Sequence, residues 1–547
     1  MRKIIFFLLT SYTILCLYTI VHTSGTCDEI AHHIGTGYSY WLTGSFRLNP
    51  ATPPLIRMIM SIPFLFLKPH LPLQSLYWKG FDTPRFNREF FFYSGNDPQM
   101  LLVCSRVMIL LLGIFLGILI YNWTRNLYGK REALWALFLY SFSPNIIAHS
   151  SLATADIGFC LFSCLSLFFF LRFLYKPYCK NLLLNGLFLG LAQLSKYTAT
   201  MLYPLYLILT VLFCITNKKK LFPFLLKLSV VFVVSLFVIW AGYLFETKPF
   251  LKDVFQPQEK LLFVKNFCKK ALPFSLYNKL DPYIDKILTQ IPLPLTTYIT
   301  GLAGVCRHVR EGHNNFFMGK WSSKGFKLYF IVAFLIKTPL PVLIFLVLFL
   351  LDVLRTKKIT FAEFSFILII IVTFVSGSLS NLQIGLRHIL IVYPFIFILC
   401  ARGINNIIKF RNSVLIKVFF IGIGVWYIYS SVSIVPHSLS YFNEIIGGPK
   451  NGYKFLRDSN IDWGQDLPSL SKVLRKMKVK KVKLLYFGED LPQRYGIMYE
   501  PLSKEEFIHP QKGQYYAISV QYMDGVKWIK YKKPVERAGF SILIYKG

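Results

Sequence analysis

Carboxylate and cationic side chains lie next to apolar segments at several points of this 547-residue chain. Asp28 and Glu29 come a few residues after an apolar run at 4–21, in the stretch TCDEIAHHIGTGYSYW. Asp156 directly precedes a second apolar run, and Lys196 interrupts a long one. A carboxylate can deprotonate an incoming hydroxyl or amine, while a cation stabilises a departing phosphate. These residue types predict group transfer from a phosphate, and their apolar setting suits a lipid phosphate.

Histidines and an arginine extend this set of candidate residues. His32 follows the acidic pair, and Arg387 with His388 opens an apolar run in NLQIGLRHILIVYP. His308 and His313 lie in CRHVREGHNNFFMGKW, at a spacing that does not place them on one helical face. Ionisable groups at this depth in a membrane are costly and usually mark a function.

A divalent metal ion is an alternative source of positive charge at such a site. Oxygen and nitrogen ligands are offered by Asp28, Glu29, Asp156, His308 and His313, but no compact ligand spacing occurs in the chain. A lysine and an arginine already supply positive charge where the phosphate should bind. We therefore expect transfer that needs no metal, with a divalent ion as the alternative.

The elements that must position these residues are membrane helices. Hydrophobic residues make up 54% of the chain, and 52 residues are phenylalanine, more than a soluble protein needs. Helices of about 20 apolar residues that cross a bilayer account for such a composition. We predict eleven spans, at about 4–21, 101–121, 132–148, 157–175, 182–197, 198–215, 221–243, 326–351, 361–380, 386–401 and 413–435.

Short basic segments predict the orientation of the spans. If the spans alternate, six such segments fall on one side: MRK, TRNLYGKR, KPYCK, NKKK, RTKK and ARGINNIIKFRN. The positive-inside rule makes that side cytoplasmic. All the candidate residues then converge on the outer surface, together with large loops at 22–100 and 244–325. A cleavable signal peptide at 1–25 is the rival interpretation of the first span.

The last part of the chain has a different pattern. VKLLYF (482–487), YYAISV (515–520) and FSILIY (540–545) alternate as strands do, and LPSLSKVLRKMK (467–478) has helical spacing. We therefore predict a transmembrane domain over 1–435 and a small extracytoplasmic α/β domain over 436–547. The fold class is an all-α polytopic membrane protein that carries this additional domain.

An ordered set of motifs resembles a known family. Besides the acidic pair, the motifs are NPATPPL (49–55), SPNIIAHSSLATAD (143–156), GLAQLSKYT (190–198), IGLRHILIVYP (384–394) and YFNEIIGGPKNGYKFLRDSNIDWGQDL (441–467). This set is similar to that of polyprenyl-phosphate-dependent glycosyltransferases of the C-type fold, which include protein O-mannosyltransferases and aminoarabinose transferases acting on lipid A. The chain departs from the family at Thr52, where histidine often precedes Pro-Pro-Leu.

The resemblance implies a role for each candidate residue. Asp28 would be the catalytic base, Glu29 its neighbour in the acidic pair and Asp156 the second acid of the site. Lys196, Arg387 and His388 would contact the carrier phosphate, with His32, His308 and His313 as further candidates. The donor would be a sugar on polyprenyl phosphate, and the acceptor a protein, lipid A or an envelope glycan outside a bacterial plasma membrane. A single displacement with one base would invert the anomeric centre.

Other interpretations of the same residues stay open at this point. A secondary transporter would also have many spans, although transporters place ionisable groups near the bilayer midplane and show repeated halves. The acidic and histidine pairs at i and i+4 could stabilise a surface helix. Asp156 could cap the helix that follows it. Lys196 and the Arg387–His388 pair could serve as interfacial anchors.

Overall fold

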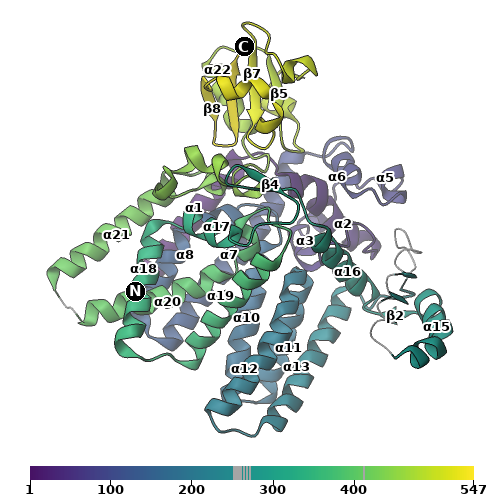
Figure 1. Ribbon diagram of the computed structural model, residues 1–547, viewed down its shortest axis with the longest axis vertical. Helices are drawn as coiled ribbons and strands as arrows, with labels where there is room; N and C mark the ends of the chain where they lie inside the picture. Colours follow the sequence, from purple (N-terminus) through teal and green to yellow (C-terminus); the bar gives the residue numbers. More distant parts are fainter. Residues whose placement is uncertain (251–260, 263–264, 267–268, 270–272, 411–412) are drawn as a thin grey trace.

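The computed structural model describes residues 1–250, 261–262, 265–266, 269, 273–410 and 413–547, so part of the predicted loop 244–325 lies outside it. Eight helices in the described residues are long and apolar enough to cross a membrane (Figure 1). They are α1 (Arg2–His22), α7 (Pro98–Leu127), α10 (Asp156–Tyr175), η2 with α12 (Tyr197–Thr216), α13 (Leu221–Gly242), α19 (Phe361–Leu379), α20 (Val392–Phe410) and α21 (Val414–Val432). The predicted mainly helical, multi-pass membrane protein is confirmed.

One further span is a bent helix pair, and two predicted spans are shorter than expected. α17 (Tyr329–Lys337) and α18 (Leu340–Thr356) meet at an angle of 110° and count as a ninth span if taken together. The predicted span 132–148 instead forms α8 (Lys130–Ser141) and α9 (Pro144–Ser150). Pro144 causes this break, because proline lacks an N–H and disfavours helical geometry in the preceding residue. The predicted span 182–197 is α11 (Cys179–Ser195), which has only 17 residues.

Close packing between α11 and α13 depends on two glycines. A Cβ atom at Gly186 would lie 2.6 Å from Val234, and one at Gly190 would lie 2.6 Å from Val238. Small residues four positions apart let two membrane helices approach closely. This contact holds the end of α11, where the chain turns at Lys196 into η2.

The predicted outer loops contain short helices of their own. Residues 22–100 form the π-helix η1 (Glu29–His33), α2 (Ile34–Thr43), α3 (Leu55–Met60), α4 (Phe64–Leu67), α5 (Leu76–Lys79) and α6 (Thr83–Phe92). The described part of 244–325 contains β1 (Thr247–Lys248), α15 (Phe274–Thr289), β2 (Leu293–Pro294), α16 (Thr296–Glu311), β3 (Asn315–Phe317) and β4 (Lys320–Ser322). Loops of this size next to a helical bundle can hold functional residues over it.

The C-terminal part carries the predicted helix and strands. α22 (Leu467–Lys476) covers one face of a five-stranded sheet with the order β6-β5-β7-β9-β8. The strands are β5 (Val482–Leu485), β6 (Tyr499–Pro501), β7 (Tyr515–Ser519), β8 (Glu536–Ala538) and β9 (Ile542–Lys546). β5 pairs in parallel with β6 and β7, whereas β9 pairs antiparallel with β7 and β8. Figure 1 shows this sheet at one end of the molecule, with the C-terminus.

A buried lysine ties the segment before this sheet to the helices. Lys337, at the end of α17, donates hydrogen bonds to the carbonyl oxygens of Leu439 (2.9 Å), Tyr441 (3.1 Å) and Asn460 (2.5 Å). The segment from Ser438 to Asp466 therefore packs against the bundle, and only the residues after it form the sheet. A domain boundary near residue 436 stays a prediction.

Candidate active site

Asp28 and Arg387 form an ion pair between two distant parts of the chain. Arg387 Nη1 donates a hydrogen bond to Asp28 Oδ2 over 2.9 Å, and both side chains are partly exposed, at 12% for Arg387 and 23% for Asp28. Asp28 directly precedes the π-helix η1. Such helical irregularities are frequent at functional sites. The pair brings together the predicted base and a predicted phosphate ligand.

Arg387 lies in the 3-10 turn η3 (Leu386–Ile389), before α20 begins at Val392. The sequence analysis placed Arg387 and His388 in the first turn of this span, so their position differs from the prediction. Gly385 immediately precedes the turn, and the Leu386 N–H donates a hydrogen bond to Asn460 Oδ1 over 3.0 Å. Because Lys337 holds Asn460, the turn that carries Arg387 is fixed through the C-terminal segment.

Asp156 and Lys196 form a second pair of the same kind. Lys196 Nζ donates to Asp156 Oδ1 over 2.7 Å, and Thr154 Oγ1 donates to Asp156 Oδ2 over 3.0 Å. Asp156 is the first residue of α10, and the N-cap position is Ala155, which forms no side-chain cap. The capping interpretation of Asp156 is therefore not supported. Arg387 also interacts electrostatically with Asp156, which connects the two pairs.

Glu29, the second member of the acidic pair, is fully buried beside Arg106. Arg106 donates to Glu29 through Nε (2.8 Å, to Oε1) and Nη2 (2.7 Å, to Oε2). The remaining acceptor positions take hydrogen bonds from the backbone and hydroxyl of Thr26 and from the Ala153 N–H. The Arg106 guanidinium also donates to three carbonyl oxygens at the end of α1. This geometry suits a role for Glu29 in positioning the turn that carries Asp28.

The C-terminal segment before α22 completes the surroundings of Asp28. The Cys27 N–H donates to the Trp463 carbonyl and the Ser24 N–H to that of Gln465, each over 3.0 Å. The Trp463 ring lies under the Arg387 guanidinium, with 4.2 Å between its centroid and Cζ. A cation stacked on an aromatic face keeps its edge free for an anion. The motif DSNIDWGQD thus contributes directly to the site.

Asp458 of this motif is an acid that the sequence analysis did not select. It interacts electrostatically with Arg387 and with Asp28, and its Oδ1 accepts a hydrogen bond from the Ser459 N–H over 2.6 Å. Burial raises the pKa of Asp458 to about 6. For Asp28, burial alone would raise the pKa, but the Arg387 guanidinium and the neighbouring histidines outweigh it and hold the pKa below its usual value. Asp28 is therefore ionised at neutral pH.

Two of the predicted histidines lie at the site. His388 is half-buried and its Nε2 is enclosed without a hydrogen-bond partner among the described residues. Burial and the Lys196 and Arg387 cations hold the pKa of His388 well below its usual range, so the ring is neutral. His32 interacts electrostatically with Asp28 and has a pKa that is lowered chiefly by burial. The surface-helix interpretation of the acidic and histidine pairs is not supported, because Glu29 pairs with Arg106.

His308 and His313 lie together at the end of α16, with ring centroids 5.9 Å apart. Among the described residues, neither forms a hydrogen bond or ion pair with the two acid–cation pairs through its ring. No group of three or more His, Cys, Asp or Glu side chains in the described part of the chain is arranged to bind a metal ion. Transfer that needs no metal ion, with a divalent ion as the alternative, therefore stays a prediction.

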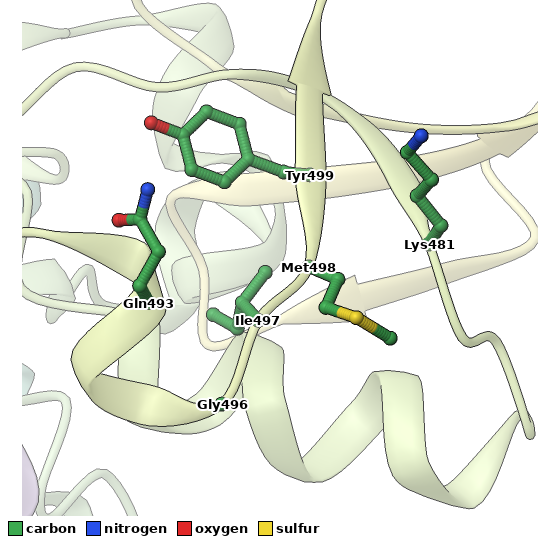
Figure 2. A pocket seen from close by; sticks show the side chains of 6 residues that line it. All are labelled: Lys481, Gln493, Gly496, Ile497, Met498 and Tyr499. Atoms are coloured by element: carbon green, nitrogen blue, oxygen red, sulfur yellow. The ribbon is translucent and has the colours of Figure 1, made fainter.

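A cavity of about 410 Å³ lies away from these residues, at the β6 edge of the sheet. It is lined by Lys481, Gln493, Gly496, Ile497, Met498 and Tyr499 (Figure 2). This lining holds no carboxylate and no histidine. It therefore lacks the pairing of a carboxylate with a cation that the candidate site has, and the acid–cation pairs remain the candidate site.

The arrangement defines a multi-pass membrane protein with paired acids and cations at one end of its helices. Residues 100–240 match the family model described as Dolichyl-phosphate-mannose-protein mannosyltransferase. This segment contains Asp156 and Lys196, so the resemblance to polyprenyl-phosphate-dependent glycosyltransferases is confirmed there. None of the curated protein sequences compared with the chain matches it.

The chain also matches solved structures at low sequence identity. ArnT from Cupriavidus metallidurans, bound to undecaprenyl phosphate, is 11% identical with a TM-score of 0.48, and the match covers 98% of this chain and 97% of that chain. The archaeal oligosaccharyltransferase AglB from Archaeoglobus fulgidus, in complex with an inhibitory peptide and a dolichol-phosphate, is 15% identical with a TM-score of 0.43. That match covers 77% of this chain and 54% of that chain.

Proposed function

We propose that this protein is an integral membrane glycosyltransferase that moves a sugar from a polyprenyl-phosphate carrier to an acceptor at the outer face of the membrane. The pairing of Asp28 with Arg387 carries the proposal, because it joins a partly exposed, ionised carboxylate to a cation that can bind phosphate. The family match over residues 100–240 supports this substrate class. The acceptor is a protein, a lipid such as lipid A, or an envelope glycan.

Binding of the donor phosphate changes the group that Arg387 contacts. In the free protein the guanidinium is bound to Asp28. A phosphate that arrives between Arg387 and Lys196 attracts both cations, because charge-assisted hydrogen bonds to phosphate are strong. Arg387 then turns from the carboxylate to the phosphate, and Asp28 becomes free to accept a proton. Donor binding in this way prepares the base.

The transfer step is a single displacement. Asp28 takes the proton from the acceptor hydroxyl or amine as that atom forms its bond to the anomeric carbon. The bond between the anomeric carbon and the phosphate oxygen breaks, and its electron pair leaves with the polyprenyl phosphate. Arg387 and Lys196 stabilise the developing negative charge. Attack from the side opposite the phosphate inverts the anomeric centre.

Neighbouring groups keep this arrangement rigid. The buried pair of Glu29 with Arg106 fixes the turn of Asp28, and Trp463 supports the guanidinium of Arg387. A site held by such supporting contacts loses little orientation freedom when substrate binds. Glu29 is thus a positioning residue in this proposal.

Mass spectrometry of cellular glycans tests the proposal. Lipid-linked sugars and envelope glycans are compared in cells that lack the protein, cells that carry it and cells that carry Asp28→Asn. The proposal predicts one glycosylated product that disappears in the first and third cells, with its lipid-linked donor accumulating. Identical glycan and donor profiles in all three would contradict it.

A further inference from the structure

A second cavity, of about 310 Å³, lies at the opposite end of the helices that hold the candidate site. It is formed by the C-terminal ends of α7 and α10 and the start of α19, and includes Trp123, Arg172 and Lys176. On α7, Trp123 is 17 residues beyond Arg106, which places the cavity about 26 Å along the helix from the Glu29 pair. The cavity is therefore separate from the candidate active site.

The walls of this cavity combine aromatic rings with free cations. The rings of Trp123 and Phe168 lie edge to face, with centroids 5.4 Å apart. The Arg172 guanidinium lies 5.5 Å from the Phe168 ring centroid. Arg172 and Lys176 are exposed and form no ion pair within the described part of the chain. The cavity thus presents two uncompensated positive charges beside an apolar surface.

Acidic side chains near the cavity are already neutralised. α7 contains no acid, and α19 contains only Glu363, next to the lining residue Ala362. Glu363 is buried; it pairs with Arg402 Nη1 at 2.5 Å and accepts a hydrogen bond from the Tyr128 hydroxyl at 2.7 Å. The cavity therefore has no free carboxylate that would repel an anion.

We propose that this cavity binds the headgroup of an anionic phospholipid. Arg172 and Lys176 contact the phosphate, and the aromatic walls pack against the glycerol and the upper acyl chain. Helix ends with basic and aromatic residues match the position of lipid headgroups at a bilayer surface. The aromatic lining by Trp123, Phe168 and Tyr175 favours a lipid over free inorganic phosphate. By the predicted orientation, this lipid belongs to the cytoplasmic leaflet, so it is distinct from the donor.

Lipid titration of the purified full-length protein tests this proposal. Native mass spectrometry in detergent follows binding of palmitoyl-oleoyl phosphatidylglycerol, with phosphatidylcholine as the neutral comparison. Replacing both cations, as Arg172→Gln with Lys176→Gln, should weaken the tightest phosphatidylglycerol site by roughly 10–30-fold, at about 1 kcal/mol per basic residue. Lys130→Gln with Lys180→Gln is the matched control, because these basic residues lie at the starts of the neighbouring helices α8 and α11 and do not line the cavity.

Equal loss in the control pair, or equally tight binding of phosphatidylcholine, would overturn the proposal. Should the test variant not fold, the wild-type protein and Trp123→Phe are compared in phosphatidylcholine vesicles containing brominated phosphatidylglycerol. Bromine quenches tryptophan fluorescence on contact, so the part of the quenching that is lost in Trp123→Phe reports a lipid in the cavity. Identical quenching of both proteins would also overturn the proposal.

Discussion

Arg387 Nη1 lies 2.9 Å from Asp28 Oδ2, although 359 residues of sequence separate them. The contact depends on the C-terminal segment. The Trp463 carbonyl accepts a hydrogen bond from the Cys27 N–H, and the Trp463 ring lies under the Arg387 guanidinium. A base that is bound to a cation in the free protein stays inactive until an anion competes for that cation. In the proposed mechanism, this ion pair is the physical reason for donor binding to precede proton transfer.

Asp28→Asn should reduce the rate of transfer by about 10²–10⁴-fold, because the amide keeps the size and polarity of the side chain but cannot act as the base. Donor binding should remain, since the neutral amide no longer competes with the phosphate for Arg387. The rate and the affinity for the lipid-linked donor are measured on purified protein. Glu505→Gln, at an exposed acid, is the control. Near-normal transfer by Asp28→Asn would mean that this carboxylate is structural.

Arg387→Ala and Lys196→Ala should each weaken donor binding by about tenfold to a hundredfold, the usual effect of losing a hydrogen bond to a charged group. Binding is measured in detergent with the lipid-linked donor. Lys324→Ala, at an exposed lysine, should leave the affinity unchanged. Unaltered affinity for the lipid-linked donor in both test variants would mean that these residues are only interfacial anchors.

Arg106→Ala should destabilise the protein by roughly 3–5 kcal/mol, because it leaves the buried Glu29 carboxylate without its partner. The melting temperature of purified protein measures this. Arg125→Ala, at an exposed position on the same helix, should have little effect. A fully stable Arg106→Ala protein would contradict the positioning role of Glu29.

Asp458 should make stability depend on pH. Its pKa of about 6 in the folded protein is above the usual value of an aspartate, so its contribution to stability is full below about pH 4 and is lost as pH rises through 6. Asp458→Asn should therefore gain stability over the wild type between pH 4 and 7. Thermal unfolding at several pH values measures the difference. A difference that does not change with pH would show that Asp458 has an ordinary pKa.

Transfer should persist in excess EDTA, because in the proposed mechanism Arg387 and Lys196 supply the positive charge at the phosphate. The assay compares the rate with and without chelator. Loss of activity that one particular divalent ion restores would contradict this expectation. His308 or His313 would then be candidates to bind that ion.

Much of the fold and part of the site could be predicted from the sequence. Long apolar runs define the membrane helices, and alternating residues mark β5, β7 and β9, because each pattern reports one face of one element. Asp28, Asp156, Lys196 and Arg387 stand out because they lie on the predicted outer side of the spans, opposite the six basic connectors. Their pairing partners depend on helix packing and are not visible in local spacing.

Other features of the site had weaker sequence signals. Arg106 lies inside an apolar run. A single charge in such a run indicates a buried ion-pair partner, but it does not identify that partner as Glu29. Asp458 lies in a motif that was noted only for its resemblance, and its position beside Arg387 depends on the Lys337 and Asn460 contacts. The break before Pro144 and the bend between α17 and α18 had proline as their signal, since Pro339 also precedes the second helix of that pair.

Release of polyprenyl phosphate tests the central claim most directly. Purified wild-type and Asp28→Asn proteins are placed in lipid nanodiscs with a lipid-linked sugar extract and an acceptor extract, and free polyprenyl monophosphate is measured over time. The proposed mechanism predicts release by the wild type and almost none by Asp28→Asn, with both proteins equally folded and the variant binding donor at least as tightly as the wild type. Equal release by both proteins, or no release by a folded wild type that binds the donor, would contradict it.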